Sequence, residues 1–294
     1  MSIAIGLDIG GTKIAGAAYD ETGKTLAQLA DPTPATYESF LESCHSIVTR
    51  LEQQAGRAAT LGACAPSADG AVLANMPALT GKPVQKDLEK LFARPVPFAN
   101  DANCAALAEA IEGAGRGHAS VFGLILGTGV GGGLILNGKI IAGVNGLCGE
   151  IGHLPLPYYE ASDGALTQCG CGQKGCIEKL IAGAALSRLH QSLTGQTADA
   201  KQIADLAASG DKPALQTLDR YYTVVAKALT TILHSFDPEI ITVSGGLSVL
   251  PDLYTEVPQR WGRYALAKSP KTKFVPAAFG SLSGLRGAAI LGRS

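Results

Sequence analysis

Two stretches that end in glycine turns open the two halves of the chain: Gly6-Leu7-Asp8-Ile9-Gly10-Gly11-Thr12 and Gly123-Leu124-Ile125-Leu126-Gly127-Thr128-Gly129. In each, a short apolar run enters the turn and a second one leaves it, which is typical of a β-hairpin with glycines at its tip. Glycine leaves backbone N–H groups open to phosphate oxygens because no Cβ intrudes. The repetition indicates a weak internal duplication in which each half opens on a hairpin that can hold phosphate.

A third glycine turn follows the apolar run 240–243. Any one such turn is more often a structural hairpin, but three of them, two at duplicated positions, favour a phosphate site. Their spacing matches neither the P-loop nor the Rossmann fingerprint, so those nucleotide folds are disfavoured. The residues that we expect at these turns are Gly10, Gly11, Thr12, Lys13, Gly127, Thr128, Gly129, Gly245 and Gly246.

Composition points to a small-molecule partner. The 294 residues are 46% hydrophobic and 17% charged, with a formal net charge of -1. This balance offers no electrostatic footprint for nucleic acid or an acidic membrane surface. The N-terminus reads as a first strand beginning at Ile3 rather than as a signal peptide, and the longest weakly polar run, 121–136, is interrupted by glycines. We therefore expect a cytoplasmic protein.

Alternating strand and helix patterns predict two α/β domains. Helical spacing of apolar residues marks 36–51 and 213–236, and buried strands are expected at 60–65, 96–99 and 240–243. Around 113–118 the composition becomes small, glycine-rich and polar, which places the boundary there. The prediction is an N-terminal domain over 1–117, completed by the C-terminal helix within 281–294, and a C-terminal domain over 118–280 that carries a metal loop.

Asn100 and Asp101 lie where a predicted strand gives way to a helix. Both residue types are preferred helix caps, so capping alone explains them at least as well as catalysis does. Ligands in open α/β sheets bind outside the carboxyl ends of strands. Beside phosphate-binding turns, the alternative interpretation is that Asp101 is a general base that accepts a hydroxyl proton during phosphoryl transfer.

The sharpest local signal is a cluster of metal-ligand residues: His153 precedes Cys169, Cys171 and Cys176, with glycines between the cysteines. Three thiolates and one imidazole make a closed, tetrahedral zinc site of the structural kind. Buried free thiols in a reducing compartment would not explain three cysteines within eight residues. Glu150 and Glu178 flank the cluster; each alone reads as a solvated carboxylate, but together with His153 they could form a wall that holds a sugar.

These motifs together resemble the ROK (repressor/ORF/kinase) family of sugar kinases. The resemblance rests on Asp8 to Lys13, Asn100-Asp101, Gly149 to His153 and the cysteine loop up to Glu178, and it runs nearly the whole length. It implies an actin-like, hexokinase-type fold (ribonuclease H-like), with two α/β domains around a central cleft. It also implies ATP and Mg²⁺ as cofactors beside structural zinc.

The resemblance also implies residue roles. Asp101 would be the catalytic base, and Asp8 would join the glycine turns at the ATP and metal site. His153 would serve twice, with one ring nitrogen on zinc and the other toward the sugar. The residues expected to contact sugar are Asn75, Asn100, Asp101, Glu150, His153 and Glu178.

Two predicted loops bear on which sugar the protein prefers. The stretch 74–83 resembles bacterial N-acetylglucosamine kinases, and Ala78 stands where glucose- and fructose-type relatives tend to carry an aromatic side chain. Asn145-Gly146 is nearer the fructokinase pattern, and Pro66-Ser67 replaces the family's usual Pro-Gly. We expect phosphorylation of the 6-hydroxyl of N-acetyl-D-glucosamine, with fructokinase or a broad hexokinase/glucokinase as the alternative, and a possible homodimer.

Two non-enzymatic alternatives come from the same family. A sugar-responsive repressor would need a DNA-binding module before the first strand, and we expect none because that strand begins at Ile3. A silent sugar-binding protein would not need Asp101 or the phosphate turns.

Overall fold

The computed structural model describes residues 3–68, 71–72 and 76–293, and these form two compact units. Unit 1 comprises residues 1–117, 133–148 and 278–294, and unit 2 comprises 118–132 and 149–277. The C-terminal helix lies in unit 1. Residues 133–148, which the sequence analysis assigned to the second domain, also pack within unit 1, because the chain changes unit inside a strand rather than at a linker.

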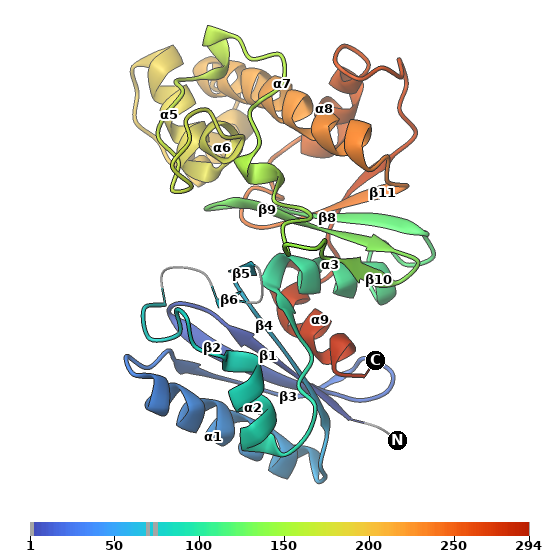
Figure 1. The fold of residues 1–294 in the computed structure, drawn as a ribbon. Helices are drawn as coiled ribbons and strands as arrows, with labels where there is room; N and C mark the ends of the chain where they lie inside the picture. Colours follow the sequence, from blue (N-terminus) through green and yellow to red (C-terminus); the bar gives the residue numbers. More distant parts are fainter. Residues whose placement is uncertain (1–2, 69–70, 73–75, 294) are drawn as a thin grey trace. The chain divides into compact units, whose positions relative to one another are not determined.

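Unit 1 is built on a five-stranded sheet of order β3-β2-β1-β4-β7 (Figure 1). The first three strands pair antiparallel as a meander, and β1, β4 and β7 run parallel. Their carboxyl ends therefore meet at one edge of the sheet. The strands are β1 (Ala4–Ile9), β2 (Lys13–Tyr19), β3 (Thr25–Pro32), β4 (Thr60–Ala65) and β7 (Phe98–Asn100), beside a two-stranded ribbon of β5 (Ser67–Ala68) and β6 (Ala71–Val72).

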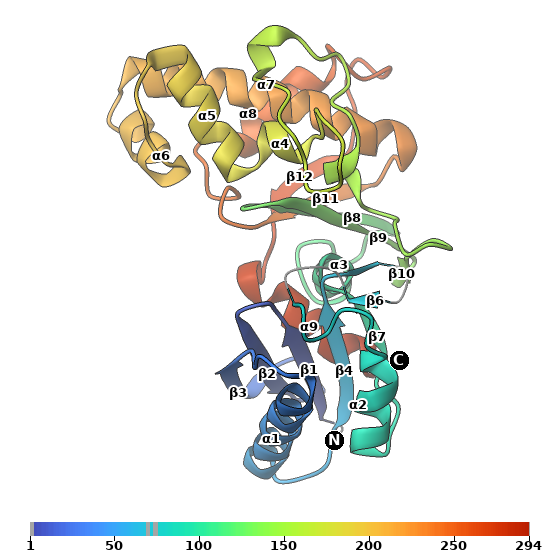
Figure 2. The ribbon, with the colours of Figure 1, turned by 60° about the vertical axis from the view of Figure 1, so that its left-hand side comes forward.

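Alternation along β1 decides what covers each face of this sheet. Ile5, Leu7 and Ile9 are fully buried in a cluster with apolar residues of α1 (Tyr37–Ala55) and α2 (Val84–Phe92). Ala4, one residue out of phase, packs instead with Leu285 of α9 (Ser283–Leu291). Successive strand side chains point to opposite faces, so the sheet is covered on both. Figure 2 shows α1 and α9 on the two sides of these strands.

Helix α9 approaches the sheet and α3 (Asp101–Ile111) unusually closely. A Cβ placed on Gly62 would lie 2.1 Å from the carbonyl oxygen of Ala288, and one on Gly287 would lie 1.7 Å from that of Cys104. Only glycine permits backbones to come this near. The C-terminal helix is thereby locked between the sheet and α3.

The second sheet has the order β10-β9-β8-β11-β12, with β8, β11 and β12 parallel. Helices cover one of its faces (Figure 2). Its strands are β8 (Ser120–Leu126), β9 (Val130–Leu136), β10 (Lys139–Ile141), β11 (Ile240–Ser244) and β12 (Lys273–Pro276). The helices of unit 2 are α4 (Glu178–Ile181), α5 (Gly183–Thr194), α6 (Ala200–Ala208), α7 (Lys212–Ser235) and α8 (Leu253–Trp261). Three short 3-10 turns complete the chain: η1 (Ile151–His153), η2 (Ala161–Asp163) and η3 (Gly280–Leu282).

Helix α7 is the longest element of unit 2, and its limits follow from its sequence. The Asp211 side chain caps it by accepting from the N–H of Ala214 at 2.8 Å, and Pro213 stands in the first turn. It ends at Ser235, with Phe236 as its C-cap, before Asp237-Pro238. This agrees with the helix predicted over 213–236. Among the described residues, no helix is both long and apolar enough to cross a membrane.

Candidate catalytic and metal-binding sites

Asn100 joins β7 to α3 and caps the helix. Its Oδ1 accepts from the N–H groups of Ala102 and Asn103 at 2.8 and 3.3 Å, and its Nδ2 donates to the carbonyl oxygen of Ser67 at 3.0 Å. The capping interpretation of Asn100 is therefore what the structure shows. The same bonds tie the loop that follows β4 to the start of α3, which fixes the position of the next residue.

Two carboxylates lie at this edge of the unit 1 sheet. Asp101 is the first residue of α3, and its Oδ1 accepts from the N–H of Ala102 at 2.9 Å. Asp8 stands near the end of β1. Burial raises the pKa of both side chains, and the charge of Asp101 raises that of Asp8 further. Burial thus favours the protonated form of both carboxylates, and Asp101 pushes Asp8 further toward it, an arrangement typical of acid–base sites.

A thiol and a helix terminus complete this corner. Cys64, fully buried on β4, donates through its Sγ to Asp8 Oδ1 at 3.7 Å. A Cβ placed on Gly284 would lie 3.7 Å from Asp8 Oδ2 and 3.8 Å from the carbonyl oxygen of Asp101. The corner of unit 1, formed by Asp8, Cys64 and Asp101, is therefore closed on one side by the first turn of α9.

The glycine turn of unit 1 is fixed by hydrogen bonds at Gly10, while the residues at its tip are exposed to solvent. The N–H of Gly10 donates to the carbonyl oxygen of Lys13 at 3.0 Å, and the hydroxyl of Thr33 donates to that of Gly10 at 2.6 Å. Gly11, Thr12 and Lys13 are exposed. The tip therefore presents backbone N–H groups, a hydroxyl and an ammonium group to solvent, which are the donors that phosphate oxygens require.

In unit 2 the other two glycine turns meet at one cavity. The cavity has a volume of about 440 Å³, and Gly127, Thr128 and Gly246 line it together with the first turn of α5. The N–H of Gly183, at that helix start, donates to the carbonyl oxygen of Gly127 at 2.8 Å. A helix N-terminus beside glycine turns suits an anion. Gly129 and Gly245 stand in the same turns, the latter with φ +92°.

Three further polar residues line this cavity, and sequence reasoning missed them. They are Ser187, Asp199 and Lys201. Asp199 also caps α6 by accepting from the N–H of Gln202 at 2.8 Å. None belongs to a recognisable motif, because their common position depends on how α5 and α6 pack. Only the helical spacing that places Ser187 in the second turn of α5 could have pointed to one of them.

The four predicted metal ligands converge in unit 2. Their ligand atoms all lie within 4.8 Å of one another, with His153 Nδ1 3.5 Å from Cys169 Sγ and Cys171 Sγ 3.5 Å from Cys176 Sγ. In a tetrahedral site with Zn–S bonds of about 2.3 Å and Zn–N bonds of about 2.1 Å, neighbouring ligand atoms are about 3.6–3.8 Å apart. The donor set and the spacing therefore fit a zinc ion.

The metal loop, residues 164–177, is closed by backbone contacts at its base. The N–H of Ile177 donates to the carbonyl oxygen of Leu154 at 2.9 Å, and that of Cys169 to Gln173 at 2.8 Å. Gly172 and Gly175 have φ of +89° and +79°, which L side chains rarely adopt. The glycines between the cysteines are what allow the chain to turn tightly enough for the thiols to meet.

Glu150, His153 and Glu178 lie around this cluster. His153 presents Nδ1 to the cysteines while its Nε2 lies 3.9 Å from Glu150 Oε2. Glu178 Oε2 accepts from the N–H of Val130 at 3.3 Å, which links the metal loop to the glycine turn at 127–129. The predicted site residues thus form one group in each unit. Asn75, also predicted, lies outside the described residues.

Comparisons with known proteins agree along the whole chain. The ROK family model matches residues 4–294. An N-acetylgalactosamine kinase of Shewanella sp. (strain ANA-3) is 38% identical over 98% of this chain and 96% of its own length. An N-acetyl-D-glucosamine kinase of Salmonella paratyphi C is 39% identical over 97% of this chain and 98% of its own.

Solved structures give the same picture. A ROK hexokinase from Thermus thermophilus superposes with a TM-score of 0.84 at 32% identity, covering 98% of this chain and 97% of its own. A ROK family glucokinase from Streptomyces griseus, solved with glucose and AMPPNP, gives a TM-score of 0.78 at 30% identity over 99% of both chains. The architecture shared with these proteins is the actin-like ATPase fold.

Proposed function

This chain belongs to the ROK family and is a sugar kinase of that family, and we propose that it transfers the γ-phosphate of ATP to the 6-hydroxyl of N-acetyl-D-glucosamine. The proposal rests first on Asp101, a half-buried carboxylate that is fixed at the start of α3 and has a pKa raised by desolvation. A base whose pKa is raised toward neutrality is better matched to accepting a hydroxyl proton.

In the proposed reaction, Asp101 accepts the proton of the sugar hydroxyl while the hydroxyl oxygen forms a bond to the γ-phosphorus. The bond from that phosphorus to the bridging oxygen breaks, and ADP leaves. Little covalent chemistry is asked of the protein, because phosphoryl transfer depends mainly on positioning and charge stabilisation. The Ala102 N–H holds Asp101 Oδ1 and leaves Oδ2 for the proton.

The glycine turns would hold the nucleotide. The exposed turn at Gly11 suits the phosphates, and the 440 Å³ cavity that Gly127, Thr128 and Gly246 line is of a size for a nucleoside. Asp8 offers hard carboxylate oxygens at the same sheet edge as Asp101, which fits Mg²⁺. When bound, Mg²⁺ would neutralise charge on the β- and γ-phosphates.

The metal loop would hold zinc and form the sugar wall. His153, Cys169, Cys171 and Cys176 fill all four tetrahedral positions, so the ion would be structural rather than catalytic. Zinc on Nδ1 of His153 would leave Nε2, beside Glu150, for a sugar hydroxyl. Glu178 would offer the third polar contact of this wall.

An N-acetylated sugar is favoured by two independent signs. The two relatives at 38% and 39% identity are named for amino sugars. The family resemblance also places the small Ala78 where glucose- and fructose-type relatives tend to carry an aromatic ring, which would leave space for an N-acetyl group. Ala78 is half-buried between the buried Met76 and Leu79, so its small size is set in a packed loop. One apolar group discriminates by only about 1–3 kcal/mol, so the preference should be graded rather than absolute.

A coupled ADP-release assay with MgATP tests the acceptor. N-acetylglucosamine should give a kcat/KM at least about tenfold above N-acetylgalactosamine, N-acetylmannosamine, glucose and fructose. The 6-deoxy analogue of N-acetylglucosamine should bind as a competitive inhibitor without turnover. Preference for fructose or glucose would discard the Ala78 argument, and turnover of the 6-deoxy analogue would discard the 6-hydroxyl. Light scattering on the same preparation would test the predicted homodimer.

A further inference from the structure

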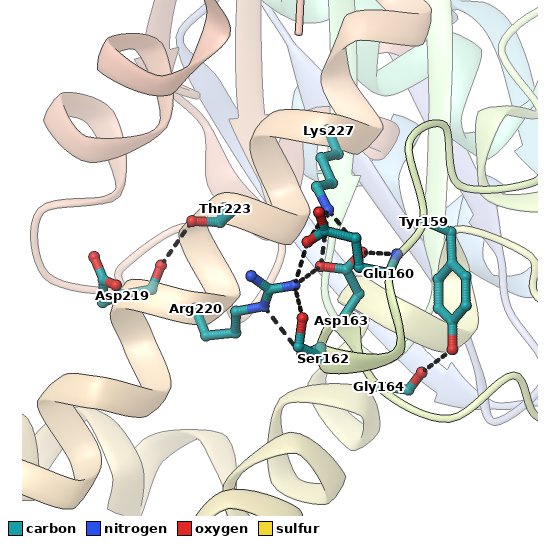
Figure 3. A network of polar contacts seen from close by, with 9 residues as sticks. All are labelled: Tyr159, Glu160, Ser162, Asp163, Gly164, Asp219, Arg220, Thr223 and Lys227. Carbon is teal, nitrogen blue, oxygen red and sulfur yellow. Dashed lines mark hydrogen bonds and ion pairs between the residues drawn. The ribbon is translucent and has the colours of Figure 1, made fainter. Parts of the chain in front are cut away.

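A buried polar network joins η2 to α7, far along the chain (Figure 3). Lys227 Nζ lies 2.9 Å from Asp163 Oδ2 and 3.2 Å from Glu160 Oε2. Arg220 reaches Asp163 Oδ1 at 2.5 Å and also contacts Glu160 and Ser162. Asp163 and Lys227 are 1% and 0% exposed, so both charges are removed from water and each depends on its partners.

Asp163 uses its whole carboxylate in this network. Its Oδ1 accepts from both cations, and its Oδ2 accepts from Lys227 and from the N–H of Glu160 at 2.7 Å. The Lys227 ammonium also lies 5.5 Å from the ring centroid of Tyr264. Two carboxylates balance two cations, so the network is charge-neutral and saturated. Such an arrangement is directional and fixes one geometry.

The network is the main tether of an otherwise superficial stretch. Across 157–168, every residue of which is described, Asp163 alone is buried. Beyond a ring contact between Tyr158 and Tyr264, with centroids 5.8 Å apart, few apolar contacts hold this stretch, so the buried Asp163 is its main anchor to α7. The other hydrogen bonds within the stretch are local: the Tyr159 hydroxyl donates to the carbonyl oxygen of Gly164 at 2.8 Å, and the N–H groups of Asp163 and Gly164 donate to the carbonyl oxygens of Glu160 and Ala161.

The tethered residue stands between the metal ligands in sequence. His153 precedes it, and Cys169, the first cysteine of the metal loop, follows six positions after it. Helix α7 also holds the far side of that loop, since the Tyr221 hydroxyl donates to the carbonyl oxygen of Ile181 at 2.6 Å. Side chains of α7 thus contact the chain at Asp163, just before the metal loop, and at Ile181, shortly after it.

We propose that Asp163, Lys227 and Arg220 are positioning residues that set the metal loop, and through it His153 and Glu178, in the geometry that binds sugar. The proposal rests on the proposed zinc site and sugar wall. Replacing a buried ion pair by apolar side chains often leaves stability unchanged, whereas removing one partner strands a charge. Stability and positioning can therefore be separated by experiment.

The test compares Lys227→Met, the double variant Asp163→Leu/Lys227→Met, and Arg260→Met as a matched control. Arg260 is another little-exposed cation of unit 2, paired with Asp219 and Glu256 away from residues 154–177. The readouts are Tm, the rate of zinc release to a chelator, the sugar KM and kcat, and hydrogen exchange of residues 157–168.

Lys227→Met should lower Tm, speed zinc release at least tenfold and raise the sugar KM at least fivefold, with kcat within threefold of wild type. The double variant should regain most of the Tm but keep the fast zinc release, the high KM and rapid exchange over 157–168. The control should lower Tm alone. Recovery of KM and zinc release together with Tm would reduce the network to a stabilising pair and overturn the proposal.

The results that would contradict the proposed function differ from those that would contradict this tether. A wild-type protein without zinc would refute the zinc site, and one without sugar turnover would refute the kinase assignment. In either case hydrogen exchange over 157–168 still decides the tether, because the double variant must lose protection there while keeping its Tm. Protection equal to wild type would overturn the proposal whatever the metal content.

Discussion

In unit 1, Asp8 and Asp101 stand at the ends of elements whose backbones touch, whereas the proposed metal ligands of unit 2 lie on a stretch with little regular structure. The unit 1 corner is held by a parallel sheet edge, a helix cap and the close approach of α9 at Gly287. The unit 2 stretch is held by one buried carboxylate, by a few backbone hydrogen bonds at the base of the loop and by ligand atoms within 4.8 Å of one another.

The difference suggests a division of labour. A general base must be placed accurately for every turnover, and regular elements supply that accuracy. A surface that meets a sugar from several directions needs irregular backbone, which must be cross-linked because it buries few apolar side chains. The two regions should therefore fail differently: the corner through its chemistry, the metal loop through its geometry.

The largest expected effect is at the corner. Asp101→Asn keeps the size of the side chain and an acceptor for the Ala102 N–H but removes the base. We expect kcat to fall by about 10²–10⁴-fold with the sugar Kd within about threefold. Steady-state kinetics measures kcat, and calorimetric titration with sugar measures Kd. Asp211→Asn, at the cap of α7, is the matched control and should be neutral because Asn caps as well as Asp.

Near-normal turnover of Asp101→Asn would place the base elsewhere and remove the contrast between a chemical and a geometric region.

Zinc removal should have the next largest effect, and that effect should be confined to unit 2. Chelation of one zinc per chain, or Cys171→Ser, should lower kcat/KM for sugar by about 10–100-fold, mostly through KM, as the wall of His153 and Glu178 loosens. Hydrogen exchange should quicken over 153–177 and stay unchanged in α3 and α9. Cys44→Ser, a buried thiol of unit 1 outside both sites, controls for loss of a cysteine.

Exchange that quickens equally in α3 would show that the two regions are not independent. A fully active preparation without zinc would show that the thiols serve packing only.

Local patterns predicted much of the site. The glycine turns, the limits of α7 and the convergence of His153 with three cysteines follow from residue types at short spacing, and the structure shows each of them. The fold class came from the combination of motifs. Short-range chemistry is visible in a sequence because its partners are neighbours along the chain.

What the sequence did not reveal depends on long-range packing. The Asp163–Lys227 pair spans 64 positions, and an isolated Asp in a polar loop looks like any solvated carboxylate. The place of residues 133–148 in unit 1 depends on contacts such as Gly133 against Asn103, which no periodicity encodes. Ser187 and Lys201 reach the cavity of unit 2 only through helix packing.

The smallest expected effect is a change in the free energy of unfolding when Asp8 at the corner is replaced. The direction of the pKa shift of Asp8 predicts the sign of this change. Burial and the charge of Asp101 raise the pKa of Asp8, so the folded state binds this proton more tightly than the unfolded chain does. Above the folded pKa the ionised carboxylate opposes folding in full. Asp8→Asn should therefore raise the free energy of unfolding at pH 7 by about 0.5–2 kcal/mol while abolishing activity.

Urea unfolding at pH 7 and at lower pH checks this sign. The advantage of Asp8→Asn should shrink as pH falls through the raised pKa of Asp8 toward the ordinary value of 3.8, because wild-type Asp8 then becomes neutral as well. Asp20 is the opposite case: hydrogen bonds from Thr22 and Lys24 lower its pKa, so Asp20→Asn should cost stability at pH 7, and less in acid. If Asp8→Asn instead lowered the free energy of unfolding at pH 7, as Asp20→Asn should, the corner would hold no electrostatic strain, and its rigidity would serve packing rather than the placement of two unfavourable charges for catalysis.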